Sequence, residues 1–114
     1  MEVSSRVIDI PANMVVVHVT GRINMNQPAP LEQELNRIIA GPPVKLILDM
    51  QKVDGIDSQG VGVLINARNA IVGKGGKVVL TAAKDRIMAV LKIAGLDSYF
   101  PMAPTEFQAI KLLE

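Results

Sequence analysis

One stretch in the middle of the chain, residues 44–65, constrains the fold more than any other. An apolar run, Val44 to Leu48, ends in Asp49 and is followed by a short polar segment. A helical pattern of apolar residues then begins directly after Asp57 and Ser58. A buried strand, a loop and a helix explain this order. In an α/β sheet the carboxyl edge of the strands is where ligands and partners meet the protein, so the stretch predicts a site at Ser58.

The remaining sequence predicts one α/β domain around this stretch. Val3–Ile10 and Met14–Val19 are expected to be strands, and the turn between them is too short for a crossover, so they form an antiparallel hairpin. After the hairpin, helical and strand-like patterns alternate. This order predicts a mixed, mostly parallel sheet of four to five strands with an N-terminal hairpin and four helices. The later elements are expected as helices at about residues 28–40, 58–72, 84–94 and 105–113 and strands at 44–48, 77–81 and 99–102.

Composition narrows the possible functions. The chain has 114 residues, of which 49% are hydrophobic and 3% aromatic, so a largely aliphatic core is expected. Aromatic rings are scarce, which argues against a platform that stacks on single-stranded nucleic acids. A net charge of +1 predicts no nucleic-acid partner. The absence of cysteine excludes disulfides, thiol nucleophiles and cysteine-bound zinc. No secretory signal and no apolar run of about 20 residues is present, so a cytoplasmic protein with no membrane partner is expected.

Two interpretations of Ser58 are open at this stage. Serine is a favoured N-cap, so its position at a helix start has an ordinary structural explanation. The functional interpretation is phosphorylation, which adds about −1.5 to −2 charges at a helix end that tolerates an anion. Asp57 is adjacent, and Asp54 and Asp49 would join it if the loop folds back. The modified cluster would then be strongly acidic and would repel an acidic partner.

Catalysis and metal binding are weaker interpretations. The single histidine, His18, lies inside a predicted strand, and nothing nearby supports a Ser-His-Asp arrangement. The Gly60-Val61-Gly62 segment falls within the first helical turn, whereas phosphate loops need glycines before the helix. We expect these glycines to let the helix approach neighbouring backbone closely. The three aspartates named above have an oxygen-rich spacing that suits magnesium, but acids in polar loops are commonly solvated or capping groups. We therefore predict no metal and no cofactor.

Several segments together resemble one known family. They are Leu46–Asp49, Val53–Leu64 with its Asp-Ser-Gln-Gly-Val-Gly core, Gly75–Leu80 and Leu91–Pro101. This combination resembles the sulfate-transporter and anti-sigma-factor-antagonist domain, abbreviated STAS, over nearly the whole chain. The resemblance implies that residues 1–114 form a single STAS domain. Stand-alone bacterial anti-sigma factor antagonists of this family are small cytoplasmic domains of about this length.

The resemblance also implies a mechanism of partner switching. The unphosphorylated protein binds an anti-sigma factor that is also a serine kinase, and this frees a sigma factor. The kinase then phosphorylates the serine that matches Ser58, and the complex breaks. A Ser/Thr phosphatase of the metal-dependent class reverses the modification. The protein itself is not an enzyme, and ATP belongs to the kinase.

The expected contact surface surrounds Ser58. Asn24 stands where the family carries an acidic residue just after the second strand, and Gln27 stands where a helix-starting threonine is common. Met25 and Met50 lie in predicted loops at the same edge, where an exposed methionine suits an adaptable surface and burial in the core is the alternative. The residues predicted to bind the partner are Asp57, Asp54, Asn24, Met25, Gln59 and Gly60.

A second function remains open. A chain of the same fold can serve as a constitutive scaffold subunit of a larger signalling or lipid-transport assembly. In that case Ser58 is only a helix cap. Co-purification with a partner that Ser58→Asp does not disturb would distinguish this function from the switch.

Overall fold

The computed structural model describes residues 2–8, 13–23 and 29–114. Its elements alternate as the sequence predicts. In chain order they are β1 (Glu2–Ile8), β2 (Met14–Ile23), α1 (Ala29–Ala40), β3 (Lys45–Ile56), α2 (Ser58–Gly73), β4 (Lys77–Thr81), α3 (Asp85–Ile93), β5 (Met102–Ala103) and α4 (Glu106–Leu113).

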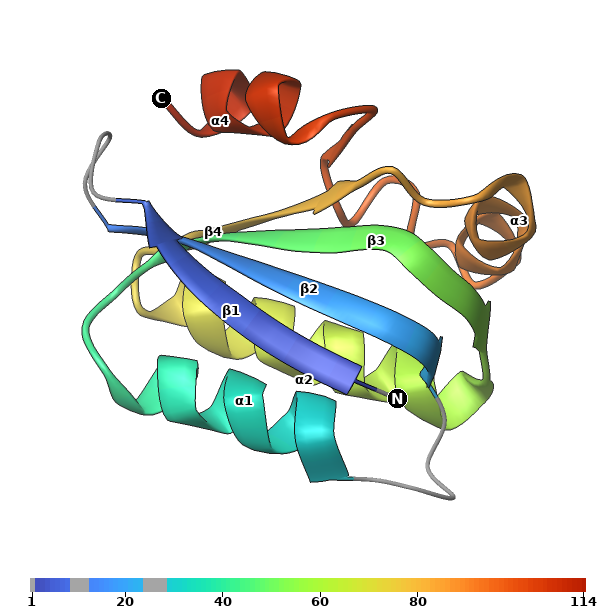
Figure 1. The fold of residues 1–114 in the computed structure, drawn as a ribbon, viewed down its shortest axis with the longest axis horizontal. Coiled ribbons are helices and arrows are strands. Elements are labelled where there is room, and N and C mark those ends of the chain that lie inside the picture. The colour runs from blue at the N-terminus through green and yellow to red at the C-terminus, as the bar shows by residue number, and fades with distance from the viewer. Residues whose placement is uncertain (1, 9–12, 24–28) are drawn as a thin grey trace.

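The strands form one five-stranded sheet in the order β1-β2-β3-β4-β5. β1 runs antiparallel to β2, and the other neighbouring pairs are parallel. The helices lie on both faces of this sheet, with α1 and α2 below it and α4 above it in Figure 1. The predicted mixed sheet with an N-terminal hairpin and four helices is therefore confirmed.

Two cores hold these layers together, because side chains of a strand alternate between faces. Val15, Val17 and Val19 of β2 point into the larger core, which also contains buried residues of α1, α2 and α3. Met14 and Val16 point to the opposite face, where α4 closes a smaller core. None of the helices in the described part of the chain is long and apolar enough to cross a membrane.

The central strands are longer than predicted. β3 was expected to end at Leu48 but continues to Ile56, and β2 was expected to end at Val19 but continues to Ile23. Beyond the end of β4 these two strands still pair with each other, with two irregularities in register. Only one face of this extension is buried, with Val53 inside and its neighbours exposed. Because the other face of these paired strands is exposed, it carries polar residues. These polar residues are the reason that the segment was predicted as a loop.

The C-terminal elements also differ in detail from the prediction. The short strand expected at 99–102 lies at Met102–Ala103. Within α4, Phe107 is 67% exposed. α4 instead packs through Ala109 and Leu113, which are four residues apart on one helical face. Phe107 lies two residues from Ala109 and therefore points away from the sheet.

Candidate functional site

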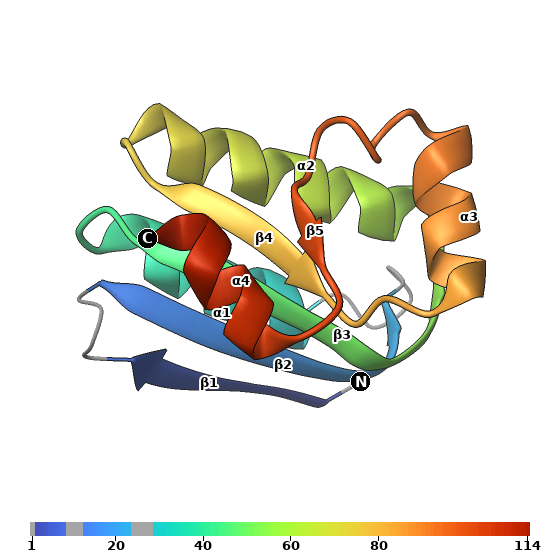
Figure 2. The same ribbon diagram turned by 90° about the horizontal axis from the view of Figure 1, so that it is seen from above.

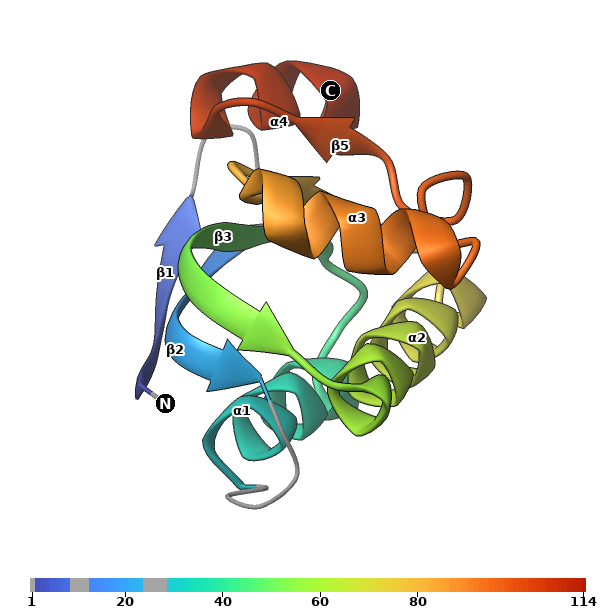
Figure 3. The same ribbon diagram turned by 90° about the vertical axis from the view of Figure 1, so that its right-hand side faces the viewer.

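The start of α2 lies directly beyond the paired ends of β2 and β3 (Figure 3). One residue, Asp57, separates the strand from the helix. Its backbone N–H donates to the carbonyl of Ile23 at 3.2 Å, and its own carbonyl accepts from the N–H of Val61 at 2.9 Å. The amino end of the helix is therefore fixed to the end of the central strands.

Asp57 is the N-cap of α2. Its backbone is extended, and its Oδ1 accepts from the N–H of Gly60 at 2.6 Å. This bond satisfies one of the helix N–H groups that lack an intrahelical partner. The cap interpretation of Ser58 is thus wrong, because the neighbouring aspartate fills that role. Ser58 is instead the first residue of the helix, and it is exposed.

The two glycines in the first turn of α2 have different surroundings. A Cβ on Gly60 would lie 2.4 Å from the carbonyl oxygen of Ile23 and 3.0 Å from Cγ1 of Ile56. Gly62 has no such neighbour within 4 Å. The predicted close approach to backbone is confirmed for Gly60 and wrong for Gly62.

The structure brings part of the predicted surface together. Asp57, Ser58 and Gln59 are exposed in succession, and Asp54 is exposed near the end of β3. Gly60 is buried, so it supports this surface from beneath. The predicted contact residues Asn24 and Met25 lie outside the described residues.

Two predicted members do not join this surface. Asp49 lies on a continuous strand, and its Oδ2 contacts Nδ1 of His18 at 2.9 Å while its Oδ1 accepts from the N–H of Gln51 at 3.0 Å. The loop that was to fold it back toward Asp57 is part of β3. Met50 is completely buried, so its exposed-surface interpretation is wrong. Across residues 2–8, 13–23 and 29–114, no cluster of three His, Asp or Glu side chains could hold a metal ion.

Sequence reasoning missed two arginines that flank the surface. Nη1 of Arg86, on α3, donates to the carbonyl of Asp54 at 3.3 Å. The guanidinium of Arg22, on β2, covers Gly55, where a Cβ would lie 3.2 Å from its Nε. Both side chains come from elements far from Ser58 in sequence, so no local motif could reveal them. They place positive charge beside the acidic end of β3.

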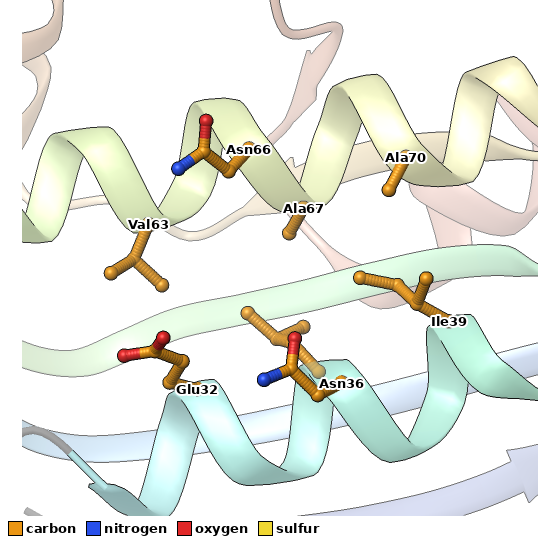
Figure 4. Close-up of a pocket in the computed structure, with 8 residues that line it drawn as sticks. Glu32, Asn36, Ile39, Val63, Asn66, Ala67 and Ala70 are labelled. Carbon is orange, nitrogen blue, oxygen red and sulfur yellow. The ribbon is translucent and has the colours of Figure 1, made fainter.

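A groove of about 250 Å³ runs between α1 and α2 (Figure 4). Asn36 and Glu32 of α1 line one side, and Asn66 of α2 lines the other. Ile39 and Ala67 give it an apolar lining. Among the described residues that line the groove, Glu32 is the one titratable side chain, so they supply no acid–base pair.

These features define a class of small α/β domain in which the first turn of a helix presents a serine beyond the carboxyl ends of the central strands. The chain belongs to the STAS domain family, whose model matches residues 5–109. The match covers nearly all of the described sheet and helices. It confirms the family that the sequence resembles.

Known relatives support this assignment. The putative anti-sigma factor antagonist BtrV of Bordetella bronchiseptica is 28% identical over 90 residues, which cover 79% of this chain and 78% of that protein. The crystal structure of an anti-sigma factor antagonist from Mycobacterium paratuberculosis superposes with a TM-score of 0.85 at 26% identity, covering 98% of this chain and 92% of that one.

A third comparison involves a phosphorylated protein. The Bacillus cell fate determinant SpoIIAA, solved in its phosphorylated form, has a TM-score of 0.75 at 18% identity. The alignment covers 99% of this chain and 100% of that one. At this identity the likeness establishes a shared fold.

Proposed function

We propose that this protein is an anti-sigma factor antagonist that acts by partner switching. As a single STAS domain, it binds an anti-sigma factor with serine kinase activity when unphosphorylated. Phosphorylation of Ser58 releases it, and a Ser/Thr phosphatase of the metal-dependent class restores it. The protein acts by binding and has no reaction of its own. Family membership and the names of its relatives support this function.

The observation that carries the proposal is the division of roles between Asp57 and Ser58. Asp57 caps α2, so the hydroxyl of Ser58 has no capping role and is exposed at the first position of the helix. A kinase can therefore reach this hydroxyl without opening the fold. The phosphorylated form of SpoIIAA is a precedent within the same fold.

The position also suits a phosphate physically. Unpaired N–H groups and the positive end of the helix dipole stabilise an anion in the first turn. The same group adds about −1.5 to −2 charges beside the exposed Asp54 and Asp57. We therefore expect the modification to leave the fold intact and to change the charge of the binding surface.

The partner-binding surface comprises Asp54, Asp57 and Gln59 around Ser58, with Gly60 as its buried support. Asn24 and Met25 are proposed to complete it. The groove between α1 and α2 shares α2 with this surface and gives the partner an apolar lining with amide groups at its rim.

Phosphorylation by the cognate kinase tests the central claim. The purified protein is incubated with its cognate serine kinase and ATP, and the intact mass is measured. One added phosphate is expected, and none on Ser58→Ala. Ser98→Ala, which also removes an exposed serine hydroxyl, should still accept one phosphate. Phosphate retained on Ser58→Ala would place the modification elsewhere.

Partner release is tested with charge at the same position. We expect Ser58→Glu to weaken binding to the kinase at least about tenfold, equivalent to about 1.4 kcal/mol. Ser58→Gln, a neutral variant of the same size, should bind more tightly than Ser58→Glu. The scaffold alternative predicts equal binding for wild type and Ser58→Glu.

A further inference from the structure

The outer edge of β4 is only partly covered. β5 pairs with Leu80 and Thr81, so in the described part of the chain residues 77–79 have no strand on that side (Figure 2). The N–H of Leu80 donates across this edge to the carbonyl of Pro101 at 3.0 Å. Alternate residues of a strand point their backbone groups the same way, so Val78 directs its N–H and carbonyl toward this strand-free edge. Val78 is 4% exposed and lies at the floor of the groove described next.

This open edge forms one side of an apolar groove of about 490 Å³. α2 contributes Val72 to its wall and α4 contributes Leu112, while Tyr99 lines it from the segment before β5. These three side chains are 40%, 54% and 39% exposed. The groove therefore joins exposed apolar side chains to a strand edge with unused pairing capacity.

The charges of the groove have one sign. Arg68 and Lys77 line it, and none of its other lining residues in the described part of the chain is acidic. The guanidinium of Arg68 lies 4.3 Å from the centre of the Tyr99 ring, which holds it at the groove wall. An occupant with carboxylates would complement these two cations.

The sign of the charge also decides between two kinds of occupant. In a two-fold dimer each patch meets its own copy, so Arg68 and Lys77 would gather four positive charges around one interface. A segment of another protein is free to carry the opposite charge. Strand addition lets such a segment use the backbone groups of the edge for affinity and alternate side chains for specificity.

We propose that this groove binds a short extended peptide segment of a partner protein, which adds as a strand beside residues 77–79 of β4. The segment carries apolar side chains for the groove and at least one carboxylate for Arg68 and Lys77. This binding site is separate from Ser58. Ser58 and Val72 lie fourteen residues apart on α2, or about 21 Å along the helix axis. A partner can therefore occupy the groove in either phosphorylation state.

The chain supplies its own reporter for the test. Tyr99 is the single tyrosine and there is no tryptophan, so tyrosine fluorescence comes from the groove alone. The probe is an acetylated and amidated hexapeptide, Glu-Val-Glu-Val-Val-Leu, titrated into the full chain. We expect a saturable fluorescence change. The same peptide with lysine in place of glutamate should bind at least about tenfold more weakly.

Variants locate the bound peptide. Lys77→Glu and Leu112→Glu should each weaken binding at least about tenfold. Lys92→Glu and Ile93→Glu make the same changes at exposed positions of α3 outside the groove and should bind as the wild type does. Methylation of alternate peptide nitrogens, which removes strand pairing, should abolish binding.

Three results would overturn the proposal. They are the absence of saturable binding, equal binding of the acidic and basic peptides, and equal binding by Lys77→Glu and Lys92→Glu. Sedimentation equilibrium without peptide tests the other possible occupant, a second copy of the chain. A dimer that Leu112→Glu dissociates and Ile93→Glu does not would assign the groove to a second copy of the chain.

Discussion

The carbonyl oxygen of Ile23 occupies the space that a side chain on Gly60 would need. A Cβ at Gly60 would lie 2.4 Å from it, and the same carbonyl accepts the backbone N–H of Asp57 at 3.2 Å. The end of β2 and the first turn of α2 are therefore in direct backbone contact. The position of Ser58 depends on this contact, because Asp57 and Gly60, the two residues that meet the Ile23 carbonyl, lie on either side of Ser58 in the chain.

Replacing Gly60 tests this contact. Gly60→Ala should lower the free energy of unfolding by about 1–3 kcal/mol, because the clash is with backbone and a strand end must move. Gly62→Ala adds the same methyl group where nothing lies within 4 Å, and it should stabilise the helix by about 0.5–1 kcal/mol. Urea unfolding measures both. Equal stabilities for the two variants would contradict the close approach.

Stability measurements also distinguish the role of Asp57 as the helix cap from that of Ser58 as the proposed modification site. Asp57→Ala removes the side-chain acceptor of the Gly60 N–H and should destabilise the protein by about 0.5–2 kcal/mol. Ser58→Ala should change the stability by less than about 0.5 kcal/mol, as expected for an exposed residue with no special contact. The reverse order would return the capping role to Ser58.

Met50 provides a test of the central core. Met50→Ala leaves a cavity at a fully buried position and should cost about 2–5 kcal/mol in unfolding free energy. Gln51→Ala, at the adjacent exposed position, should change stability by less than about 0.5 kcal/mol. Thermal and urea unfolding give the comparison. A mild effect of Met50→Ala would mean that this side chain does not belong to the core.

Glu34 predicts a small dependence of stability on pH. The hydrogen bond from Arg37 holds the pKa of the Glu34 carboxyl below its ordinary value of 4.5, and Ser5 also donates to it. The folded state thus favours the carboxylate, and this contribution is present above pH 4.5 and is lost as the pH falls through the lowered value. Glu34→Gln should lower the urea midpoint at pH 7 but not in strong acid.

A variant of Arg37, the residue that pairs with Glu34, provides the control. Arg37→Gln should lower the midpoint at pH 7 in the same direction, and the double variant should lose less than the sum of the two single changes. High salt should reduce all three effects, because both side chains are at the surface. A midpoint difference for Glu34→Gln that persisted in strong acid would assign its effect to something other than charge.

The sequence predicted the bounds of an element best where a single helix or strand carries a clear apolar pattern of its own. Lys77–Thr81 was predicted with its observed bounds, since its apolar centre allows one interpretation. The start of α2 at Ser58 was also correct, because an apolar periodicity begins directly after it. The mixed sheet followed from the alternation of strand-like and helical patterns, and the family followed from the resemblance of the motif segments to STAS domains.

What the sequence could not reveal depends on contacts between distant segments. The extension of β2 and β3 beyond β4 is stabilised by their mutual pairing, and its polar residues predict a loop when taken alone. Arg22 and Arg86 reach the end of β3 from other elements. The cap was assigned to the wrong residue, because Ser58 alone was considered for this role from the sequence. Aspartate caps helices as well as serine does, and only the geometry of the first turn assigns the role to Asp57.

The capping by Asp57 has a practical consequence for labelling. Because the side chain at position 58 is not needed by the helix end, it can be exchanged for a reactive one. The protein contains no cysteine, so Ser58→Cys would introduce its sole thiol at the first turn of α2. A fluorophore or spin label attached there would report each arrival and departure of the partner from the residue that is proposed to control them.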